Sequence, residues 1–530
     1  MPKCTIDGKE IEVKPGTTVL QAALDNGIHL QYFCWHPDLP VDGNCRTCMI
    51  EVEKMPKLQI ACNTVVAEGM VVHTKSAKAH EAQRTALEFL LINHPIDCPV
   101  CDQAGECYLQ DNYMRYGLYD SKIELEEKVH KRKVVDLGPI MLDAERCVLC
   151  SRCLRFEDKV TGTNSLQFVS RGDHTSISTF DGRKIEHEYA GNLADVCPVG
   201  ALLSTDFRFK MRVWFLKEHE SVCPGCSTGC NIYVDERDGG VQRLRSRRNP
   251  EVNKSWLCDP GRALYKQIDV TERVSGARVR GAGGWAGVTV SEALDRVAEA
   301  LKAGAASAFL ATPQGTNEDL FVFKTLADSV GGKLDFRVGD PQLKVRQMLD
   351  NVLQHVDRNP NTQGCLDQAL GRDGVDAILA ACRAGSVKAL VLQGPELLRV
   401  PEAVDAIAKV PFVAAMATHE GPELDRATVV LPASMWAEVS GTFTNYQRRV
   451  QRLDVAVPPP GDAQPRWELA AGVLSRLGKA LTAASPREVF GLVARATPGY
   501  EGLDYRALAY MGVALQPPAG AGDAAQEARA

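Results

Sequence analysis

Residues 147–153 read CVLCSRC, and the segment DVCPVG follows at residues 195–200. Three thiols in the spacing C-x2-C-x2-C, completed by a Cys-Pro pair, are typical of the cysteines that hold a [4Fe–4S] cluster in bacterial ferredoxins. There the Cys-Pro pair follows after three residues, whereas here it stands 44 positions after Cys153, so we expect a fourth ligand from a distant part of the chain. Three thiols so tightly spaced fit a zinc site poorly. The candidate ligands are Cys147, Cys150, Cys153 and Cys197.

The composition is that of a large globular protein. The chain has 530 residues, 45% of them hydrophobic, and a net charge of −6, which allows several cores and three or four domains. A mildly acidic chain creates no positive electrostatic potential that would attract nucleic acid, so we expect no nucleic-acid partner. No apolar run reaches the ~18 residues of a membrane helix, and the N-terminal MPKCTIDGKE lacks the pattern of a signal peptide. Of the 18 cysteines, 15 fall into four clusters before residue 259, which indicates metal ligands rather than disulfides.

The first of these clusters has the spacing C-x10-C-x2-C-x13-C. Plant-type ferredoxins hold a [2Fe–2S] cluster with C-x4-C-x2-C and a remote cysteine, so the order agrees although the first gap is longer. Gly43 and the small Thr47 suit a loop that has to wrap around a cluster. The alternative is a structural zinc ribbon, but such a ribbon usually offers two CxxC pairs and only one is present. The candidate ligands are Cys34, Cys45, Cys48 and Cys62.

The second cluster lies in HPIDCPVCDQAGEC, residues 94–107, with the spacing H-x3-C-x2-C-x5-C. One imidazole and three thiols could close a tetrahedral zinc site or hold a [4Fe–4S] cluster. Pro95 and Pro99 break helices and keep the segment open. A neutral histidine would leave the cluster less negative than a fourth thiolate, which favours reduction. The alternative for the histidine is a helix-end residue that binds no metal. The candidate ligands are His94, Cys98, Cys101 and Cys107.

The fourth cluster, after the one that contains CVLCSRC, has the spacing C-x2-C-x3-C-x27-C. Four thiolates suit [4Fe–4S], and zinc has more weight here because we expect this unit to be small and isolated. The candidate ligands are Cys223, Cys226, Cys230 and Cys258. The remaining Cys4, Cys365 and Cys382 share no spacing, and we expect them to be small buried hydrophobic residues.

The predicted pattern of helices and strands differs between the N-terminal and the C-terminal parts of the chain. Residues 1–75 predict two strands that meet at Asp7-Gly8, a helix over 17–27 with Thr17 or Thr18 as its cap, and strands in CMIEVE and MVVHT, which together form a small α+β grasp. Residues 76–120 predict a helix that ends at Pro95. After about residue 285, helices alternate with apolar strands, which indicates a parallel α/β sheet. The final AGAGDAAQEARA is expected to be disordered.

Several motifs that would indicate an active site are missing from the sequence. There is no strand–G-x-G-x-x-G–helix unit and no P-loop, and GARVRGAGG (276–284) lacks both the fingerprint and a flanking strand. No catalytic triad or carboxylate pair stands out. A chain with many candidate clusters and no substrate site is expected to carry electrons between partners. The basic run RLRSRRNP (243–250) predicts a solvated face, with a partner surface as the alternative.

In this order, the four motifs resemble those of the large iron–sulfur subunit of bacterial NADH:quinone oxidoreductase, respiratory complex I. The resemblance is specific over residues 1–265 and continues more weakly through ATVVLPASMWAEVSGTFTNYQRRVQ (427–451). It implies a multidomain α+β and α/β chain. The implied domains are a [2Fe–2S] ferredoxin-like β-grasp domain (1–78), a His/Cys-ligated [4Fe–4S] segment (79–120), a [4Fe–4S] ferredoxin-like domain (121–215), a [4Fe–4S] molybdopterin-oxidoreductase-type small domain (216–272), a shortened molybdopterin-oxidoreductase-like α/β domain (273–516) and a disordered tail (517–530).

The resemblance also implies a function for the chain within an oxidoreductase complex. Electrons would come from NADH through a flavin-bearing subunit and other iron–sulfur subunits. They would pass through the [2Fe–2S] cluster, then the cluster of the CVLCSRC set and the His-ligated cluster, toward quinone. The fourth cluster would lie off this path, which gives one [2Fe–2S] and two to three [4Fe–4S] clusters in all. No flavin, NAD or molybdopterin is expected on this chain, which would lie at the cytoplasmic face of the inner membrane and reach the membrane arm only through other subunits.

Three other classes of protein share parts of this pattern. An iron-only hydrogenase would need four further cysteines in the C-terminal half, where only Cys365 and Cys382 occur. A molybdopterin formate dehydrogenase would use Cys365 as a metal ligand, but NTQGCLDQAL lacks the neighbouring Arg and His expected there. An electron-transfer subunit of an NAD-linked hydrogenase or formate dehydrogenase would carry the same arrangement of clusters and differ only in its partners. This class stays as the alternative.

Overall fold

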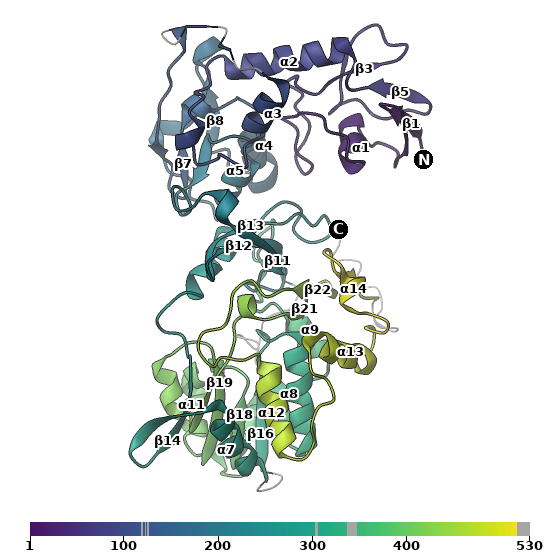
Figure 1. Ribbon diagram of the computed structural model, residues 1–530. Coiled ribbons are helices and arrows are strands. Elements are labelled where there is room, and N and C mark those ends of the chain that lie inside the picture. Colours follow the sequence, from purple (N-terminus) through teal and green to yellow (C-terminus); the bar gives the residue numbers. More distant parts are fainter. Residues whose placement is uncertain (118–119, 122, 125–126, 303–305, 337–346, 517–530) are drawn as a thin grey trace. The chain divides into compact units, whose positions relative to one another are not determined.

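The computed structural model divides the chain into two units, Met1–Leu216 and Lys217–Ala530 (Figure 1). It describes all residues except 118–119, 122, 125–126, 303–305, 337–346 and 517–530, so the predicted disordered tail lies outside the described residues. In the described part of the chain, no helix is long and apolar enough to cross a membrane.

The first unit opens with a five-stranded sheet in the order β2-β1-β5-β3-β4. Its first two strands are antiparallel and joined at Asp7 and Gly8, whose positive φ angles of 49° and 84° make the tight turn predicted there. The helix α1 packs against the sheet, and the side chain of Thr18 caps it by accepting a hydrogen bond from the backbone N–H of Gln21. The predicted α+β grasp is thus confirmed. Its elements are β1 (Lys3–Ile6), β2 (Lys9–Glu12), α1 (Val19–Asp25), β3 (Met49–Val52), β4 (Gln59–Ile60) and β5 (Met70–His73).

The rest of the first unit consists of short elements joined by long loops. The helix predicted to run to Pro95 ends four residues earlier, at Leu91. Two small antiparallel sheets follow, in the order β10-β7-β6 and β8-β9. Little regular structure is left in the segments that carry cysteines. The elements are α2 (Ala77–Leu91), α3 (Tyr108–Tyr116), β6 (Val135–Asp136), β7 (Ile140–Leu142), α4 (Arg152–Phe156), β8 (Leu166–Val169), β9 (Ser176–Thr179), α5 (Gly191–Val196) and β10 (Leu202–Ser204).

The second unit begins with a three-stranded antiparallel sheet, β11-β12-β13, followed by α6. The basic run of residues 243–250 lies on β13, where it forms contacts inside the chain. Arg243 and Arg245 pair with Asp235 at 2.6 and 2.7 Å, and Arg247 donates to the backbone O of Tyr510. The prediction of a solvated basic face was therefore wrong, because an acidic residue on the neighbouring strand faces the run. The elements are β11 (Lys217–Val222), β12 (Asn231–Arg237), β13 (Gly240–Ser246) and α6 (Asp259–Arg262).

The largest sheet has seven strands in the order β15-β14-β20-β19-β18-β16-β17. The five strands from β20 to β17 are parallel, as predicted from their apolar runs. Alternate strand residues face opposite cores: Phe309, Val391 and Met416 pack with α7, α8 and α12, and Leu310 and Leu392 pack with α10 and α11. Helices therefore cover both faces. The elements are α7 (Val290–Lys302), β16 (Ser307–Ala311), α8 (Asn317–Ser329), β17 (Lys333–Phe336), α9 (Thr362–Asp367), α10 (Val375–Arg383), β18 (Ala389–Leu392), α11 (Pro401–Ile407), β19 (Phe412–Ala417), β20 (Val429–Pro432) and α12 (Arg466–Arg476).

One expectation about the stretch GARVRGAGG was wrong. Residues Ala277–Gly281 form a strand, β14, which makes an antiparallel hairpin with β15 (Gly284–Val288) and joins the edge of the parallel strands at β20. The guanidinium carbons of Arg278 and Arg280 lie 5.0 and 4.8 Å from the centre of the Trp285 ring. This contact between the two strands stabilises the hairpin. The alternation of apolar and polar residues that would predict a strand is hard to recognise here, because many of the residues are glycine or alanine.

A small C-terminal subdomain completes the second unit. Its sheet has the order β21-β22-β23, and α13 and α14 pack near it. The elements are β21 (Gly441–Thr444), β22 (Arg449–Leu453), α13 (Pro486–Ala496), α14 (Tyr505–Leu508) and β23 (Val513–Ala514).

Candidate iron–sulfur sites

The CVLCSRC set lies in an irregular loop that ends in α4. Leu149 and Ser151 have positive φ angles of 53° and 60°, which curl the loop back on itself. The backbone N–H of Leu149 therefore donates to Sγ of Cys147 at 3.4 Å. Burial raises the pKa of Cys147 to about 12 and that of Cys150 to about 11. The distant Cys197 directly follows the last residue of α5. It lies close enough to Cys147 to raise the pKa of that thiol further, as Cys150 also does.

Three cysteines of the first set lie on the loop between α1 and β3, and Cys62 lies in the turn that follows β4. Its thiols are close enough to hydrogen-bond one another: bonds from Cys45 and Cys62 lower the pKa of Cys34 to about 2, and a bond from Cys62 lowers that of Cys48. The backbone N–H of Cys34 donates to Sγ of Cys45 at 3.5 Å. Gly43 has a φ of 72° that a residue with a side chain rarely adopts, and a Cβ there would lie 2.9 Å from Ile60.

The second set lines one cavity with all four of its donors, His94, Cys98, Cys101 and Cys107. The Nδ1 atom of His94 is buried and has no hydrogen-bond partner among the described residues. Burial lowers the pKa of this imidazole to about 4, so it is neutral at pH 7 and able to donate a lone pair to a metal. Gly200 also lines this cavity, and a Cβ there would lie 2.5 Å from Sγ of Cys101.

The fourth set also lines one cavity with all four of its thiols, Cys223, Cys226, Cys230 and Cys258. Burial raises the pKa of Cys258 to about 11 and those of Cys223 and Cys230 as well. A Cβ at Gly261 would lie 3.1 Å from Sγ of Cys258 and 3.2 Å from Sγ of Cys223, so the glycine leaves room beside both thiols.

The loop that carries this set is not isolated, contrary to the prediction. The backbone N–H of Ser227 donates to the backbone O of Asp357 at 2.9 Å, and Nε2 of Gln451 donates to the backbone O of Gly229 at 2.9 Å. The set is therefore built into the α/β part of the second unit, which the spacing of four cysteines cannot reveal.

These donor sets fit clusters held by thiolates. A buried thiol with neither a positive partner nor hydrogen-bond donors stays protonated, and bound metal ions supply the positive charge that favours the thiolate. Loops with backbone N–H groups directed at sulfur and glycines beside the thiols match that requirement. In the part of the chain that the structure describes, no group of three or more His, Cys, Asp or Glu side chains is arranged to hold a single metal ion.

The first three sets share one hydrophobic cluster. It contains thiols of the first set (Cys34 and Cys45), the second (Cys107) and the CVLCSRC set, hereafter the third set, packed with Phe33, Leu87 and Leu109. The contribution of the third set is Cys147, Cys150 and Cys197. Donors that are 163 residues apart in the sequence, from 34 to 197, are thus brought into a single apolar region of the first unit.

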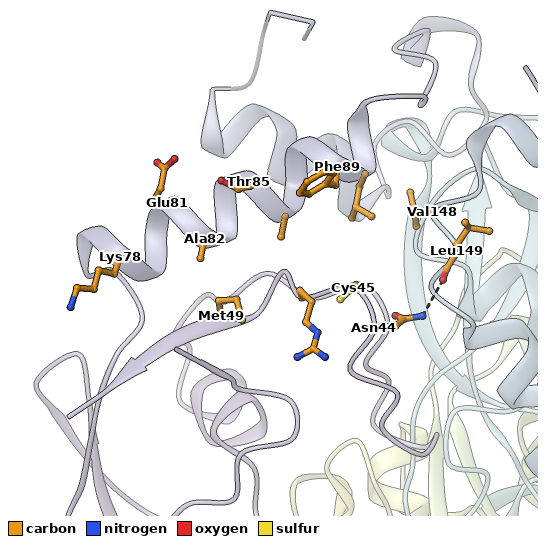
Figure 2. Close-up of a pocket in the computed structure, with 13 residues that line it drawn as sticks. Asn44, Cys45, Met49, Lys78, Glu81, Ala82, Thr85, Phe89, Val148 and Leu149 are labelled. Carbon is orange, nitrogen blue, oxygen red and sulfur yellow. Dashed lines mark hydrogen bonds between the residues drawn. The ribbon is translucent and has the colours of Figure 1, made fainter. Parts of the chain in front are cut away.

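Direct contacts join the third set to each of the other two. Nδ2 of Asn44, in the first-set loop, donates to the backbone O of Leu149, in the third-set loop, at 3.1 Å (Figure 2). The backbone N–H of Tyr108, next to Cys107 of the second set, donates to the backbone O of Pro198, next to Cys197 of the third set, at 3.1 Å. The third set therefore touches both neighbours.

A groove with a volume of about 780 Å³ lies between α2 and the loops of the first and third sets (Figure 2). Cys45 and Leu149 line it, together with Phe89, which projects from α2 with 72% of its surface exposed. No local pattern in the sequence indicates this groove, because it forms where three separate segments meet.

The three cysteines outside the sets lie in hydrophobic cores. Cys4 is in the core of the N-terminal sheet, and Cys365 and Cys382 are in the two cores on either face of the seven-stranded sheet. Their burial agrees with the expectation of small buried hydrophobic residues.

Five family models match separate parts of this chain. Their order confirms the predicted fold class of a [2Fe–2S] domain, [4Fe–4S] domains and a molybdopterin-oxidoreductase-like domain, while the exact domain boundaries stay a prediction. The models are a 2Fe–2S iron–sulfur cluster binding domain (3–77), the NADH-ubiquinone oxidoreductase-G iron–sulfur binding region (83–122), the ferredoxin-like domain of NADH-quinone oxidoreductase subunit 3 (138–203), the molybdopterin oxidoreductase Fe4S4 domain (216–269) and molybdopterin oxidoreductase (351–476).

Curated relatives confirm the resemblance predicted from the four motifs. The chain is 38% identical over 334 residues to the subunit designated G of NADH-quinone oxidoreductase from Rickettsia conorii, a match that covers 62% of this chain and 49% of that protein. It is 42% identical over 282 residues to the subunit of the same designation from Streptomyces coelicolor, covering 53% of this chain and 34% of that protein. The chain therefore matches about half or less of the length of these relatives. A solved NAD+-reducing [NiFe]-hydrogenase in the H2-reduced state covers 40% of this chain and 91% of its own at 30% identity, with a TM-score of 0.37.

Proposed function

We propose that this chain is an electron-transfer iron–sulfur subunit of an NADH:quinone oxidoreductase. The observation that carries the proposal is the single hydrophobic cluster that contains thiols of the first three donor sets. Iron–sulfur clusters held there would pass single electrons, with potentials tuned by ligand type, burial and hydrogen bonds to sulfur. The relatives named as subunits of NADH-quinone oxidoreductase support the identity of the complex.

The residues proposed as ligands are the four donor sets, with His94 as the one imidazole. The [2Fe–2S] cluster would be held by Cys34, Cys45, Cys48 and Cys62. The His-ligated [4Fe–4S] cluster would be held with Cys98, Cys101 and Cys107. The third and fourth [4Fe–4S] clusters would be held by Cys147, Cys150, Cys153 and Cys197, and by Cys223, Cys226, Cys230 and Cys258.

The surroundings would exclude water from the first three sites. Phe33 and Leu109 are buried against the thiols, and both cysteines nearest the junction of the sets, Cys34 and Cys150, are themselves buried. An apolar setting of this kind strengthens the electrostatic effect of each nearby hydrogen bond or charge on a cluster.

The partners follow from the same proposal. This chain would receive electrons from a subunit that binds NADH and flavin and pass them to other iron–sulfur subunits, and it would reach the membrane arm only through those subunits. No dinucleotide fingerprint occurs in the sequence, so NADH would be oxidised elsewhere in the complex.

The first experiment measures iron, acid-labile sulfide and zinc per chain after anaerobic purification of the full chain. One [2Fe–2S] and three [4Fe–4S] clusters predict about 14 iron atoms and no zinc, with several overlapping paramagnetic resonance signals after reduction. About 10 iron atoms would mean that one [4Fe–4S] site is empty. Zinc in place of iron would refute the electron-transfer function.

Two matched cysteine variants assign the iron to the proposed sites. Cys150→Ser removes a proposed ligand of the third site and is expected to remove about four iron atoms and one signal. Cys382→Ala removes a thiol that is also buried but lies on α10, in one core of the seven-stranded sheet, and it is expected to keep all the iron. Equal iron in both variants would contradict the assignment.

The assignment to the complex is tested by isolating the tagged chain with its native partners. The proposal expects a flavin-containing subunit to copurify and NADH to reduce the clusters of this chain. Reduction by hydrogen or formate in the same preparation, with none by NADH, would instead favour the alternative partners.

A further inference from the structure

The guanidinium of Arg155 lies at the junction of the first and third donor sets. Arg155 is half-buried on α4. Its Nη2 donates to the backbone O of Cys34 and to the backbone O of Cys150, the latter at 3.3 Å, while Nη1 donates to the backbone O of Pro40. Its Nε donates to Oγ of Ser151 at 3.0 Å. One cation therefore contacts the backbone of a candidate ligand in each of two sites.

Two further hydrogen bonds run between the same two loops. Oγ of Ser151 donates to Asp42, and Nδ2 of Asn44 donates to the backbone O of Leu149 at 3.1 Å. The two loops thus meet through a set of side chains in which Arg155 carries the positive charge. Because the guanidinium is a rigid planar fork with fixed donor directions, it constrains the two backbones more strictly than a flexible ammonium would.

The charge acts on both sites in the same direction. Taking up one electron makes a cluster more negative, and a fixed positive charge nearby favours that state. Charge-assisted hydrogen bonds to the carbonyl groups of both cysteine residues keep this charge in place. Removing it is expected to make both sites harder to reduce.

On the basis of the proposed function, we propose that Arg155 is a positioning residue that couples the first and third cluster sites. Its fork holds the two ligand loops at a fixed separation, and its charge raises the reduction potentials of both clusters. All four of its hydrogen-bond partners among the described residues belong to the first-set loop or the third-set loop.

The test compares three variants of the full chain, purified anaerobically with its clusters. Arg155→Gln removes the charge and the fork, and Arg155→Lys keeps the charge without the fork. Arg84→Gln is the matched control, because Arg84 lies on α2 and its ion pair is with Glu88 of the same helix, at 3.7 Å. Each sample is titrated with dithionite, which supplies one electron per cluster, and followed by paramagnetic resonance.

Arg155→Gln is expected to lower the reduction equilibrium constants of the [2Fe–2S] cluster and of one [4Fe–4S] cluster on the order of tenfold each, which is about 59 mV for one electron. Arg155→Lys is expected to restore both midpoints while the magnetic interaction between the two reduced clusters stays altered, since the loop separation is no longer fixed. Arg84→Gln is expected to match the wild type in both measurements.

The proposal is overturned if Arg155→Gln keeps all its iron and shifts neither midpoint potential from the wild-type value by more than Arg84→Gln does. If Arg155→Gln loses iron, Arg155→Lys decides: wild-type midpoints with an altered interaction support the proposal, and an unaltered interaction overturns it. A wild-type chain without iron would refute the proposed function before any question about Arg155 arises.

Discussion

Replacing Gly200 by alanine is predicted to empty the His-ligated site. A Cβ at this position would lie 2.5 Å from Sγ of Cys101 and 3.2 Å from Cβ of Gln103. Non-bonded atoms prefer separations of about 3.5–4.0 Å, so the sulfur would have to move by ~1 Å. The φ angle of Gly200 is not in the left-handed region, so the backbone accepts alanine and the clash with sulfur is the main new strain.

This displacement is large compared with what a metal site tolerates. Metal–ligand distances are held within about 0.2 Å, and overpacking of a filled interior costs typically about 1–3 kcal/mol. The expected result is that about 4 of the roughly 14 iron atoms are lost, together with the signal of one [4Fe–4S] cluster, while the [2Fe–2S] signal remains.

The assay is iron and sulfide analysis with paramagnetic resonance of the reduced chain. The control is Gly276→Ala, because a Cβ at Gly276 would meet nothing within 4 Å and its φ angle is also outside the left-handed region. If Gly200→Ala holds as much iron as Gly276→Ala and shows the same signals, then Cys101 does not bind a cluster in the position given by this structure.

Two further predictions concern the second unit. Arg273 and Glu438 form a buried bidentate ion pair with N–O distances of 2.6 and 2.8 Å. Arg273→Leu leaves the carboxylate buried without its partner and should lower the free energy of unfolding by about 3–5 kcal/mol in denaturant titrations. The control Arg296→Ala, at a side chain that is 65% exposed, should change it by less than about 0.5 kcal/mol. Burial raises the pKa of Glu318 from 4.5 to about 8, so the folded chain keeps a proton that the unfolded chain loses above about pH 5, and stability should fall as pH rises from about 5 to 8. Glu318→Gln should flatten this fall in the melting temperature, and an unchanged slope would contradict the assignment.

The regular elements were predictable where the local sequence determines them. Asp7-Gly8 adopts the tight turn because both residues tolerate positive φ angles, and Thr18 caps α1 because its hydroxyl reaches the N–H of Gln21. The five parallel strands follow from apolar runs that are buried on both faces. The hairpin of β14 and β15 was missed because its glycine and alanine residues obscure the alternation of a strand, and because the contact of Trp285 with two arginines of the other strand leaves no local pattern.

The proposed donors were identified from the spacing of cysteine and histidine residues, whereas the surroundings of these donors could not be identified in this way. Cysteine and histidine side chains are recognisable by type, and a cluster needs several of them close together. Gly200 carries no such signal, although it leaves the space beside Cys101, and Arg155 is one of many arginines in the chain. Their roles depend on contacts between segments that are far apart in the sequence, which no local pattern records.

The third donor set contacts both of the other sets of the first unit, although it comes last of the three in the sequence. Along the chain the His94 set comes second, but in the structure the third set touches both others, through Arg155 and Asn44 on one side and Pro198 on the other. In the proposed path, an electron that enters at the first site passes to the third site and then to the His-ligated one. Because the apolar region between the sites is continuous, a variant such as Cys150→Ser, which removes only the third cluster, should leave the other two clusters in place and interrupt transfer between them.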